Sequence, residues 1–351
     1  MPALLLCILI SCARGPSNLK TAFKNDFQIG ATLGYRFNAD STLKELTKTH
    51  FNVITPENQM KWGPIHPKEE DYNFAPMDTL VGFALQNNIK VIGHTLTWHS
   101  QTPGWVFEDG ENNPAKRGVL LQRMQNHIST VVSRYNGKIH GYDVVNEAIC
   151  DPKDGPELLR NSKYLQIIGP DYIEKAFQFA RQADPDAQLY YNDYNLANPD
   201  KRAKAVELIK SLQNKGVHID AIGMQGHWNI YEPTVEQVEK SILAYSALGI
   251  DVMITEMDIS LFRHKDERDI YRESVPDSIL QLQARRYGEM FKLFKKHSDR
   301  ISRVTFWGTT DKYSWLNNWP VRDRVNHPLL FDRGAKPKPA YFAVLKAATE
   351  Q

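Results

Sequence analysis

Short apolar runs rich in β-branched residues alternate with helical patterns along most of the chain. Eight of these runs begin after a turn or helix-end signal and end in polar residues, which is the pattern of buried strands. They cover residues 27–33, 51–56, 90–96, 141–146, 188–192, 221–225, 251–255 and 302–307. Between most of them, apolar residues recur at helical spacing, as in 78–88 and 118–135. This alternation predicts an α/β fold.

Proline and glycine mark the ends of the later helices. Helical patterns begin at Pro170, Pro199 and Pro233, and two of them end at Gly216 and Gly249. Eight strand–helix units without a linker or a shift in composition predict a single (β/α)8 TIM barrel over residues 26–351. A two-domain doubly wound sheet fits less well, because it would need such a linker.

The first residues have the character of an export signal. The apolar run at 4–10 is too short to span a bilayer but suits the core of a signal peptide, although no Lys or Arg precedes it. Leu9-Ile10-Ser11-Cys12 also resembles a bacterial lipobox. We therefore predict a leader at 1–12, a linker at 13–25, and a bacterial protein that is secreted or membrane-anchored through a lipid on Cys12. An ordinary cleaved signal is the alternative.

Composition limits the partners of the folded domain. The 351 residues are 42% hydrophobic, and 43 Lys and Arg nearly balance 41 Asp and Glu. No basic block recurs, so a nucleic-acid partner is excluded and a neutral or weakly acidic polymer is favoured. Cys150 is the one cysteine beyond the leader, so we interpret it as a small buried apolar residue without a disulfide. We expect a monomer.

Chemically unusual residues follow the predicted strands. In a barrel of this kind the active site lies at the carboxyl ends of the strands. Glu147 and Glu256 each end an apolar run, so burial and a neighbouring charge can separate their two pKa values. One acid and one base can cut a glycosidic bond. Amides and Trp at other strand ends suit the hydroxyl edges and apolar faces of sugars, although a single Trp could equally fill the core.

A metal site is the rival interpretation of the same strand ends. His94, His99, His227, Glu256 and Asp258 could converge as ligands. Neither a His-x-His pair at the first strand nor a His-Glu-x-x-His motif is present, and no phosphate-binding glycine loop occurs. We therefore expect chemistry that needs no metal and no organic cofactor.

Five motifs stand in the order found in one enzyme family. They are Thr-Pro-Glu-Asn-Gln-Met-Lys-Trp at 55–62, Gly-His-Thr-Leu-Thr-Trp-His-Ser-Gln at 93–101, Asp-Val-Val-Asn-Glu at 143–147, Ile-Thr-Glu-Met-Asp at 254–258 and Thr-Phe-Trp-Gly at 305–308. From residue 27 to residue 342 the chain thereby resembles the endo-β-1,4-xylanases of glycoside hydrolase family 10. Pro56 and Met257 stand where Ala and Leu are usual, and neither should take part in chemistry.

The resemblance implies a retaining double displacement, with Glu147 as general acid/base and Glu256 as nucleophile. It also implies that His227 and Asp258 orient the nucleophile and that Asn146 binds the sugar 2-hydroxyl. The residues that match positions lining the glycone subsites are Glu57, Asn58, Lys61, His94, Trp98, Gln101, Gln225, Trp307 and Trp315. Retaining carboxyl groups lie about 5 to 5.5 Å apart, so one attacks the anomeric carbon while the other protonates the leaving oxygen.

We therefore expect a retaining endo-β-1,4-xylanase that acts on xylan and xylo-oligosaccharides. Two alternatives stay open: a retaining barrel hydrolase of another β-1,4-glycan, and a catalytically inactive surface lipoprotein that binds xylan. Trp307 or Trp315 is the candidate for excluding the hydroxymethyl group that glucose has and xylose lacks. The charged stretch 263–277 either shapes the leaving-group subsites or lies solvated.

Overall fold

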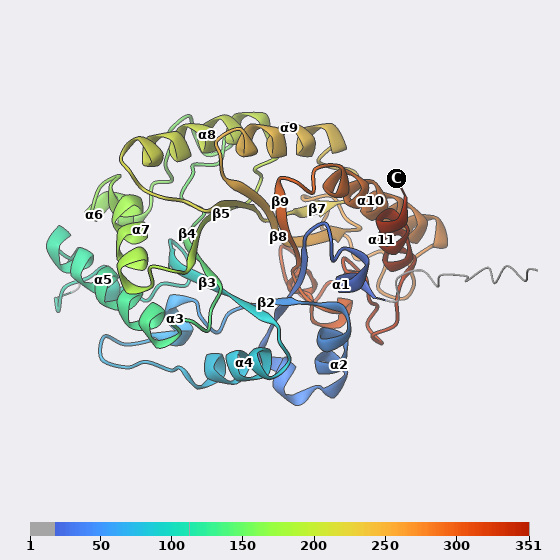
Figure 1. Ribbon diagram of the computed structural model, residues 1–351, viewed down its shortest axis with the longest axis horizontal. Coiled ribbons are helices and arrows are strands. Elements are labelled where there is room, and N and C mark those ends of the chain that lie inside the picture. Colours follow the sequence, from blue (N-terminus) through green and yellow to red (C-terminus); the bar gives the residue numbers. More distant parts are fainter. Residues whose placement is uncertain (1–17, 112, 351) are drawn as a thin grey trace, which may run out of the picture.

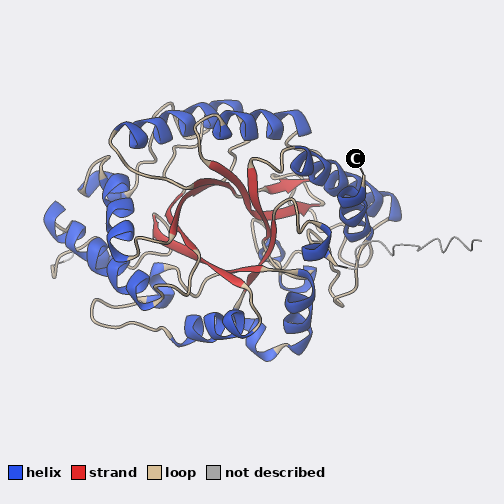
Figure 2. Cartoon of the chain, viewed as in Figure 1, coloured by secondary structure: helices blue, strands red, loops and turns tan. Residues whose placement is uncertain are grey.

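A computed structural model describes residues 18–111 and 113–350. Within these ranges eight parallel strands form a closed ring, and helices surround it (Figure 1, Figure 2). The strands of the ring are β1 (Gln28–Leu33), β2 (Val53–Pro56), β3 (Lys90–Trp98), β4 (Gly141–Asn146), β5 (Gln188–Asp193), β6 (Ala221–Met224), β8 (Asp251–Ser260) and β9 (Ile301–Phe306). The predicted (β/α)8 barrel is confirmed.

The ring closes through two pairings that the sequence order alone does not reveal. β1 pairs with both β2 and β9, so the first and last strands are neighbours. β6 pairs with β8, with Ala221 opposite Asp251. The short strand β7 (His227–Asn229) was not predicted, and it pairs with the carboxyl-terminal part of β8, which continues past the predicted end at 255. This pairing places His227 directly beside Asp258.

The helices follow the strands in chain order, with capping residues setting where they begin. α8 begins at Pro199 as predicted, whereas α7 and α9 begin two residues after Pro170 and Pro233. A capping box of Thr234 and Gln237 fixes the start of α9. The helices are α1 (Leu19–Ala22), α2 (Ser41–His50), α3 (Trp62–Ile65), α4 (Ala75–Gln86), α5 (Arg117–Arg134), α6 (Lys163–Ile167), α7 (Tyr172–Ala183), α8 (Pro199–Asn214), α9 (Val235–Ser246), α10 (Asp277–Lys296) and α11 (Pro339–Thr349).

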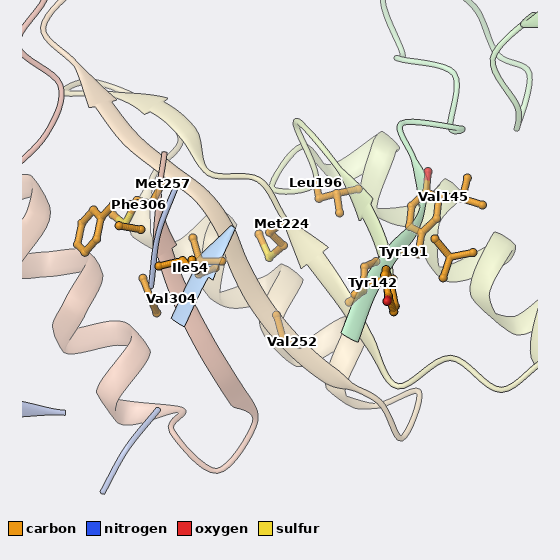
Figure 3. Packing of buried hydrophobic residues seen from close by; sticks show 14 of the residues in the cluster. Ile54, Tyr142, Val145, Tyr191, Leu196, Met224, Val252, Met257, Val304 and Phe306 are labelled. Carbon is orange, nitrogen blue, oxygen red and sulfur yellow. The ribbon is translucent and has the colours of Figure 1, made fainter. Parts of the chain in front are cut away.

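The main core lies between the ring and its helices. Neighbouring residues of a strand point to opposite faces of the sheet. Ile54 and Phe306 belong to the large apolar cluster between strands and helices (Figure 3). Phe306 stacks on Phe291 of α10 with ring centroids 5.9 Å apart. A second, smaller cluster consists of residues from five strands of the ring: Val53, Ile92, Tyr190, Ala221 and Met253.

Residues 18–25 differ from the linker predicted for 13–25. Leu19–Ala22 form α1, and Leu19 and Phe23 are fully buried. The Phe23 ring stacks on Phe27 at 5.0 Å and lies 5.2 Å from Phe291. α1 also contacts α11, so the two ends of the domain lie side by side (Figure 1). These long-range contacts hold residues 18–25 in place, although this stretch is too short and polar to show a helical pattern in the sequence. The predicted leader, including Cys12, lies outside the described residues.

Residues 263–276, between β8 and α10, are held by contacts with the segment near Arg324. The Arg324 guanidinium donates to the carbonyl of Asp266 at 2.5 Å, and the Asp269 side chain accepts from the backbone of Val325 at 3.2 Å. These contacts join the loop to the segment near Arg324, and its residues Arg263 and His264 line the cleft at the carboxyl ends of the strands. Cys150 is free and buried, as predicted. Among the described residues, no helix has the length and apolarity needed to cross a bilayer.

Candidate active site

The carboxyl ends of the barrel strands open into one cleft of about 750 Å³. Side chains that lie far apart in the sequence meet here because each stands towards the carboxyl end of a ring strand or in the segment that follows it. All fourteen residues that the sequence assigned to the site line this cleft: Glu147, Glu256, His227, Asp258, Glu57, Asn58, Lys61, His94, Trp98, Gln101, Asn146, Gln225, Trp307 and Trp315.

Glu256 lies within β8 with only 4% of its surface exposed. Its Oε1 accepts a hydrogen bond from Asn192 at 2.8 Å, and its Oε2 lies 3.1 Å from Nε2 of His227. Burial alone would raise the pKa of this carboxyl. The hydrogen bond from His227, the nearby His94 and His227 imidazoles and the hydrogen bond from Asn192 together outweigh burial and hold the pKa of Glu256 below its usual value. The carboxylate is therefore kept ionised and fixed in direction.

Glu147 directly follows β4 in a left-handed backbone conformation, with φ of 57°. Residues other than glycine rarely adopt this region, and such strain is typical of functional sites. The indole of Trp98 donates to Oε2 at 2.9 Å, and the amide of Gln225 donates to Oε1 at 2.9 Å. The Glu147 side chain stays 15% exposed. Substrate and water can therefore reach this carboxyl, whereas its partner is almost completely enclosed.

Two residues hold both glutamates at once. The Gln225 side chain donates to Glu147, and its backbone carbonyl accepts from the Glu256 N–H at 2.6 Å. The backbone carbonyl of Asn192 accepts from the Glu147 N–H at 2.9 Å, while its side chain donates to Glu256. The Asn192 amide also lies 2.9 Å from the side-chain oxygen of Asn146. The two carboxyl groups are thus linked through single intervening residues, which fixes their relative position.

His227 forms a bridge between two carboxylates. Its Nδ1 lies 2.9 Å from Oδ2 of Asp258, and the same oxygen accepts from the Trp315 indole at 2.8 Å. Burial lowers the pKa of an imidazole, but the Asp258 carboxylate and the hydrogen bonds to both acids outweigh it. Together they raise the pKa of His227 to about 10. His227 is therefore a cation at neutral pH, oriented by Asp258 toward Glu256.

The cleft also combines charged groups with indoles. The Lys61 ammonium donates to Asn58 at 3.1 Å and lies 5.0 Å from the centre of the Trp98 ring. Burial lowers the pKa of Lys61, and the surrounding glutamates oppose this effect. Burial likewise raises the pKa of Glu57, which Lys61 partly offsets. These polar groups and indole rings suit a sugar ring, because the polar groups can bond the hydroxyls around its rim and the indoles can pack on its C–H faces.

His94, which the sequence also proposed as a metal ligand, pairs with a buried acid instead. Its Nδ1 lies 2.9 Å from Oδ2 of Asp143, and its ring meets Trp307 edge-on at 5.2 Å. His227 is similarly engaged by Glu256 and Asp258. In the described part of the chain, no three His, Cys, Asp or Glu side chains are grouped as metal ligands.

The sequence assigned no role to two residues that contact the catalytic pair, Asn192 and Arg160. Asn192 stands at the end of β5, and this strand-end position beside other amides was the available signal. Arg160 donates to the Glu147 carbonyl at 3.0 Å and to the Tyr194 hydroxyl at 2.5 Å. Arg160 lies in an irregular segment after β4, so no pattern in the sequence could place it.

A (β/α)8 barrel with one ionised and one accessible carboxyl at its carboxyl-terminal end, flanked by indoles and amides, defines a barrel glycoside hydrolase. The chain matches glycosyl hydrolase family 10 over residues 18–347, and it belongs to that family. The predicted resemblance is therefore confirmed.

Relatives cover nearly the whole chain. Endo-1,4-beta-xylanase B of Paenibacillus barcinonensis is 43% identical over 328 residues, which cover 93% of this chain and 97% of that protein. An endo-1,4-beta-xylanase of Geobacillus stearothermophilus is 44% identical over 95% of this chain and 99% of its own length. The crystal structure of xylanase B from Clostridium stercorarium F9 has a TM-score of 0.90 and 44% identity, covering 93% of this chain and 99% of that one.

Proposed function

We propose that this protein is an endo-β-1,4-xylanase that cuts internal bonds of xylan and xylo-oligosaccharides with retention of configuration. The observation that carries the proposal is the enclosure of Glu256, an ionised carboxylate aimed into the cleft by His227 and Asn192. A protein that only bound xylan would have no use for this arrangement beside a second carboxyl. Relatives over the full length of the domain are named xylanases.

In the first step a Glu256 oxygen attacks the anomeric carbon, and a glycosyl ester forms as the glycosidic C–O bond breaks. Glu147 gives its proton to the departing oxygen. The side-chain hydrogen bonds favour this division of roles. Glu256 is bonded by the His227 cation and by Asn192, whereas the Glu147 carboxyl accepts from the neutral Trp98 indole and Gln225 amide.

In the second step Glu147 takes a proton from water, whose oxygen attacks the anomeric carbon and displaces Glu256. Esterification has by then removed the negative charge of Glu256, so Glu147 can carry a negative charge without repulsion. The partial exposure of Glu147 gives water access to it. Two inversions at the same carbon restore the β configuration of the product.

Selection of xylose over glucose is proposed to be steric. Trp307 and Trp315 both line the cleft, and Trp315 is held by its hydrogen bond to Asp258. An indole placed over the sugar carbon that bears the hydroxymethyl group of glucose would exclude that group. In Trp307→Ala the ratio of xylan to glucan hydrolysis should fall, and an unchanged ratio would remove Trp307 from this role.

The proposal is tested by reducing-end release from xylan with purified protein, compared with Glu256→Ala. The wild type should release xylo-oligosaccharides, and the variant should lose this activity while its thermal midpoint stays near that of the wild type. Glu239→Ala is a matched control, since Glu239 pairs with Lys296 on the surface away from the cleft. Activity retained in Glu256→Ala would refute the mechanism.

Export is proposed on the leader pattern at 1–12, with Cys12 as the lipidated residue. The discriminating experiment is metabolic labelling with a radioactive fatty acid in a bacterial host, comparing the wild type with Cys12→Ala. Label and membrane association that both disappear in the variant would support the anchor. Soluble, unlabelled protein from both chains would favour a secreted enzyme with a cleaved signal.

We also propose a monomer, because one chain supplies the complete cleft. Light scattering coupled to size-exclusion chromatography should give one chain mass across the micromolar range. A concentration-independent dimer mass would contradict this proposal.

A further inference from the structure

A second cavity, of about 500 Å³, lies at the end of the barrel opposite the catalytic cleft. Its wall is built at the amino ends of the strands, from residues at or near the starts of β1, β3, β4, β5 and β9. Tyr190 and Met253 belong both to this wall and to the small apolar cluster within the ring. None of the fourteen cleft residues lines it. The polar lining of this second cavity therefore has no role in the catalytic cleft.

Arg303 is the unusual residue of this cavity. It stands on β9, two and four residues before Thr305 and Trp307, so it shares their inward face. Only 3% of its surface is exposed, and its Nε has no hydrogen-bond partner. Its guanidinium lies 5.5 Å from the Tyr190 ring, and none of the ion pairs among the described residues includes it. Arginine is rarely buried without an anionic partner, because an unpaired buried charge is costly.

The other charged groups of the wall are mostly basic as well. Lys24 and Lys90 line the cavity with Arg303, against a single carboxylate, Asp26. The Lys90 ammonium lies 3.3 Å from Nε2 of His140. Burial and the Arg303 charge lower the pKa of Lys90, and burial with both cations lowers the pKa of His140 to about 4. Outside the wall, the buried Asp143 carboxylate, which contacts His94, favours the charged form of Arg303 but forms no ion pair with it. Within the wall, Arg303 therefore has no carboxylate partner.

We propose that this cavity binds a small anion through its oxyanion group, a phosphate or a carboxylate, with Arg303 as the principal ligand and Lys90 as the second. A guanidinium presents several N–H groups in one plane, which suits either oxyanion. The volume lies within the range of small-molecule sites, so a monosaccharide acid fits as well as inorganic phosphate. The anion would pair directly with Arg303 inside the cavity, at the face of the barrel that serves stability.

Calorimetric titration of the full chain with inorganic phosphate, D-glucuronate and xylose, at constant ionic strength set with chloride, tests the site. Phosphate, glucuronate or both should bind the wild type saturably, and xylose should not compete with them. Arg303→Met should weaken this binding at least tenfold, and Lys90→Met should weaken it to a smaller extent. Without anion, Arg303→Met should melt at or above the wild-type temperature, because it removes an unpaired buried charge.

The relative affinities identify the source of the oxyanion. Tighter binding of phosphate assigns a free inorganic anion, and tighter binding of glucuronate assigns a sugar acid. Xylan hydrolysis by both variants should equal that of the wild type, which verifies that they are folded and separates this site from the catalytic one. Equal binding to wild type and Arg303→Met, or no binding of either anion to the wild type, would overturn the proposal.

Discussion

Removal of the His227 imidazole should change both the rate of catalysis and its dependence on pH. The imidazole lies 3.1 Å from Glu256 and 2.9 Å from Asp258, and its pKa is raised to about 10 from an ordinary value of 6.5. That shift corresponds to roughly 5 kcal/mol of preference for the charged form, at 1.36 kcal/mol per unit. Asp258 makes the largest contribution to stabilising the charged imidazole, so the contribution of Glu256 to the raised pKa of His227 is smaller.

A hydrogen bond to a charged group contributes about 1.5–3 kcal/mol. Loss of the His227 hydrogen bond in His227→Ala should raise the pKa of Glu256, because burial then acts against fewer stabilising contacts. The acidic limb of kcat/KM should therefore move to higher pH, and the plateau should fall at least tenfold. His227→Gln keeps a neutral donor and should fall between His227→Ala and the wild type.

The assay is kcat/KM for a chromogenic aryl β-xylobioside between pH 3 and 9. His218→Ala is the control, because His218 is exposed and pairs only with Asp220. The control should reproduce the wild-type profile. An acidic limb that stays in place in His227→Ala, or moves to lower pH, would refute the reasoning that His227 keeps the nucleophile ionised.

Four further predictions concern His227, Glu147, Trp315 and Lys201. Stability contributed by His227 is complete below pH 6.5 and lost as pH rises to about 10, so urea midpoints of wild type and His227→Ala should converge over that range. Glu147→Ala should lower xylan hydrolysis by about 10³-fold, within the usual range for acid/base catalysis, while azide should restore turnover of an activated aryl xyloside as the β-azide. Trp315→Phe removes a donor at 2.8 Å and should lower kcat/KM roughly tenfold with little change in thermal midpoint. Lys201, whose ammonium lies 2.7 Å from the fully buried carboxylate of Asp193, is a structural case. Lys201→Met leaves Asp193 without its ion pair and should cost about 3–5 kcal/mol in urea unfolding, against less than about 1 kcal/mol for Lys240→Met at the exposed Lys240–Glu236 pair.

The sequence was sufficient for the barrel because its signals are local and repeated. Each strand is an apolar run of ordinary length, and Gly216 and Gly249 follow helices α8 and α9 with positive φ, as a helix end requires. The segments that escaped prediction depend on distant contacts. Strand β7 forms through its pairing with β8, and α1 is ordered by Phe291, far along the chain.

The site was predictable as a set of residues but not as a set of contacts. Strand ends meet in a barrel, so Glu147 and Glu256 had to face one cleft. Which groups bond them depends on geometry that no pattern encodes: Trp98 and Gln225 donate to Glu147, although the resemblance placed them only among sugar-binding positions. Asn192 was visible at a strand end, yet its contact with Glu256 depends on the neighbouring strands of the folded ring.

The central claim is that Glu256 forms a covalent bond with the sugar. The enzyme is incubated with a 2-deoxy-2-fluoro xylobioside that carries a good leaving group. The fluorine slows both steps, and the good leaving group speeds the first step again, so that the glycosyl ester accumulates. Mass spectrometry should show one added 2-deoxy-2-fluoroxylobiosyl group per chain, and fragmentation of the proteolytic peptide should place it on Glu256. A wild-type chain that turns over xylan yet gains no label, or carries the label on another residue, would contradict the claim.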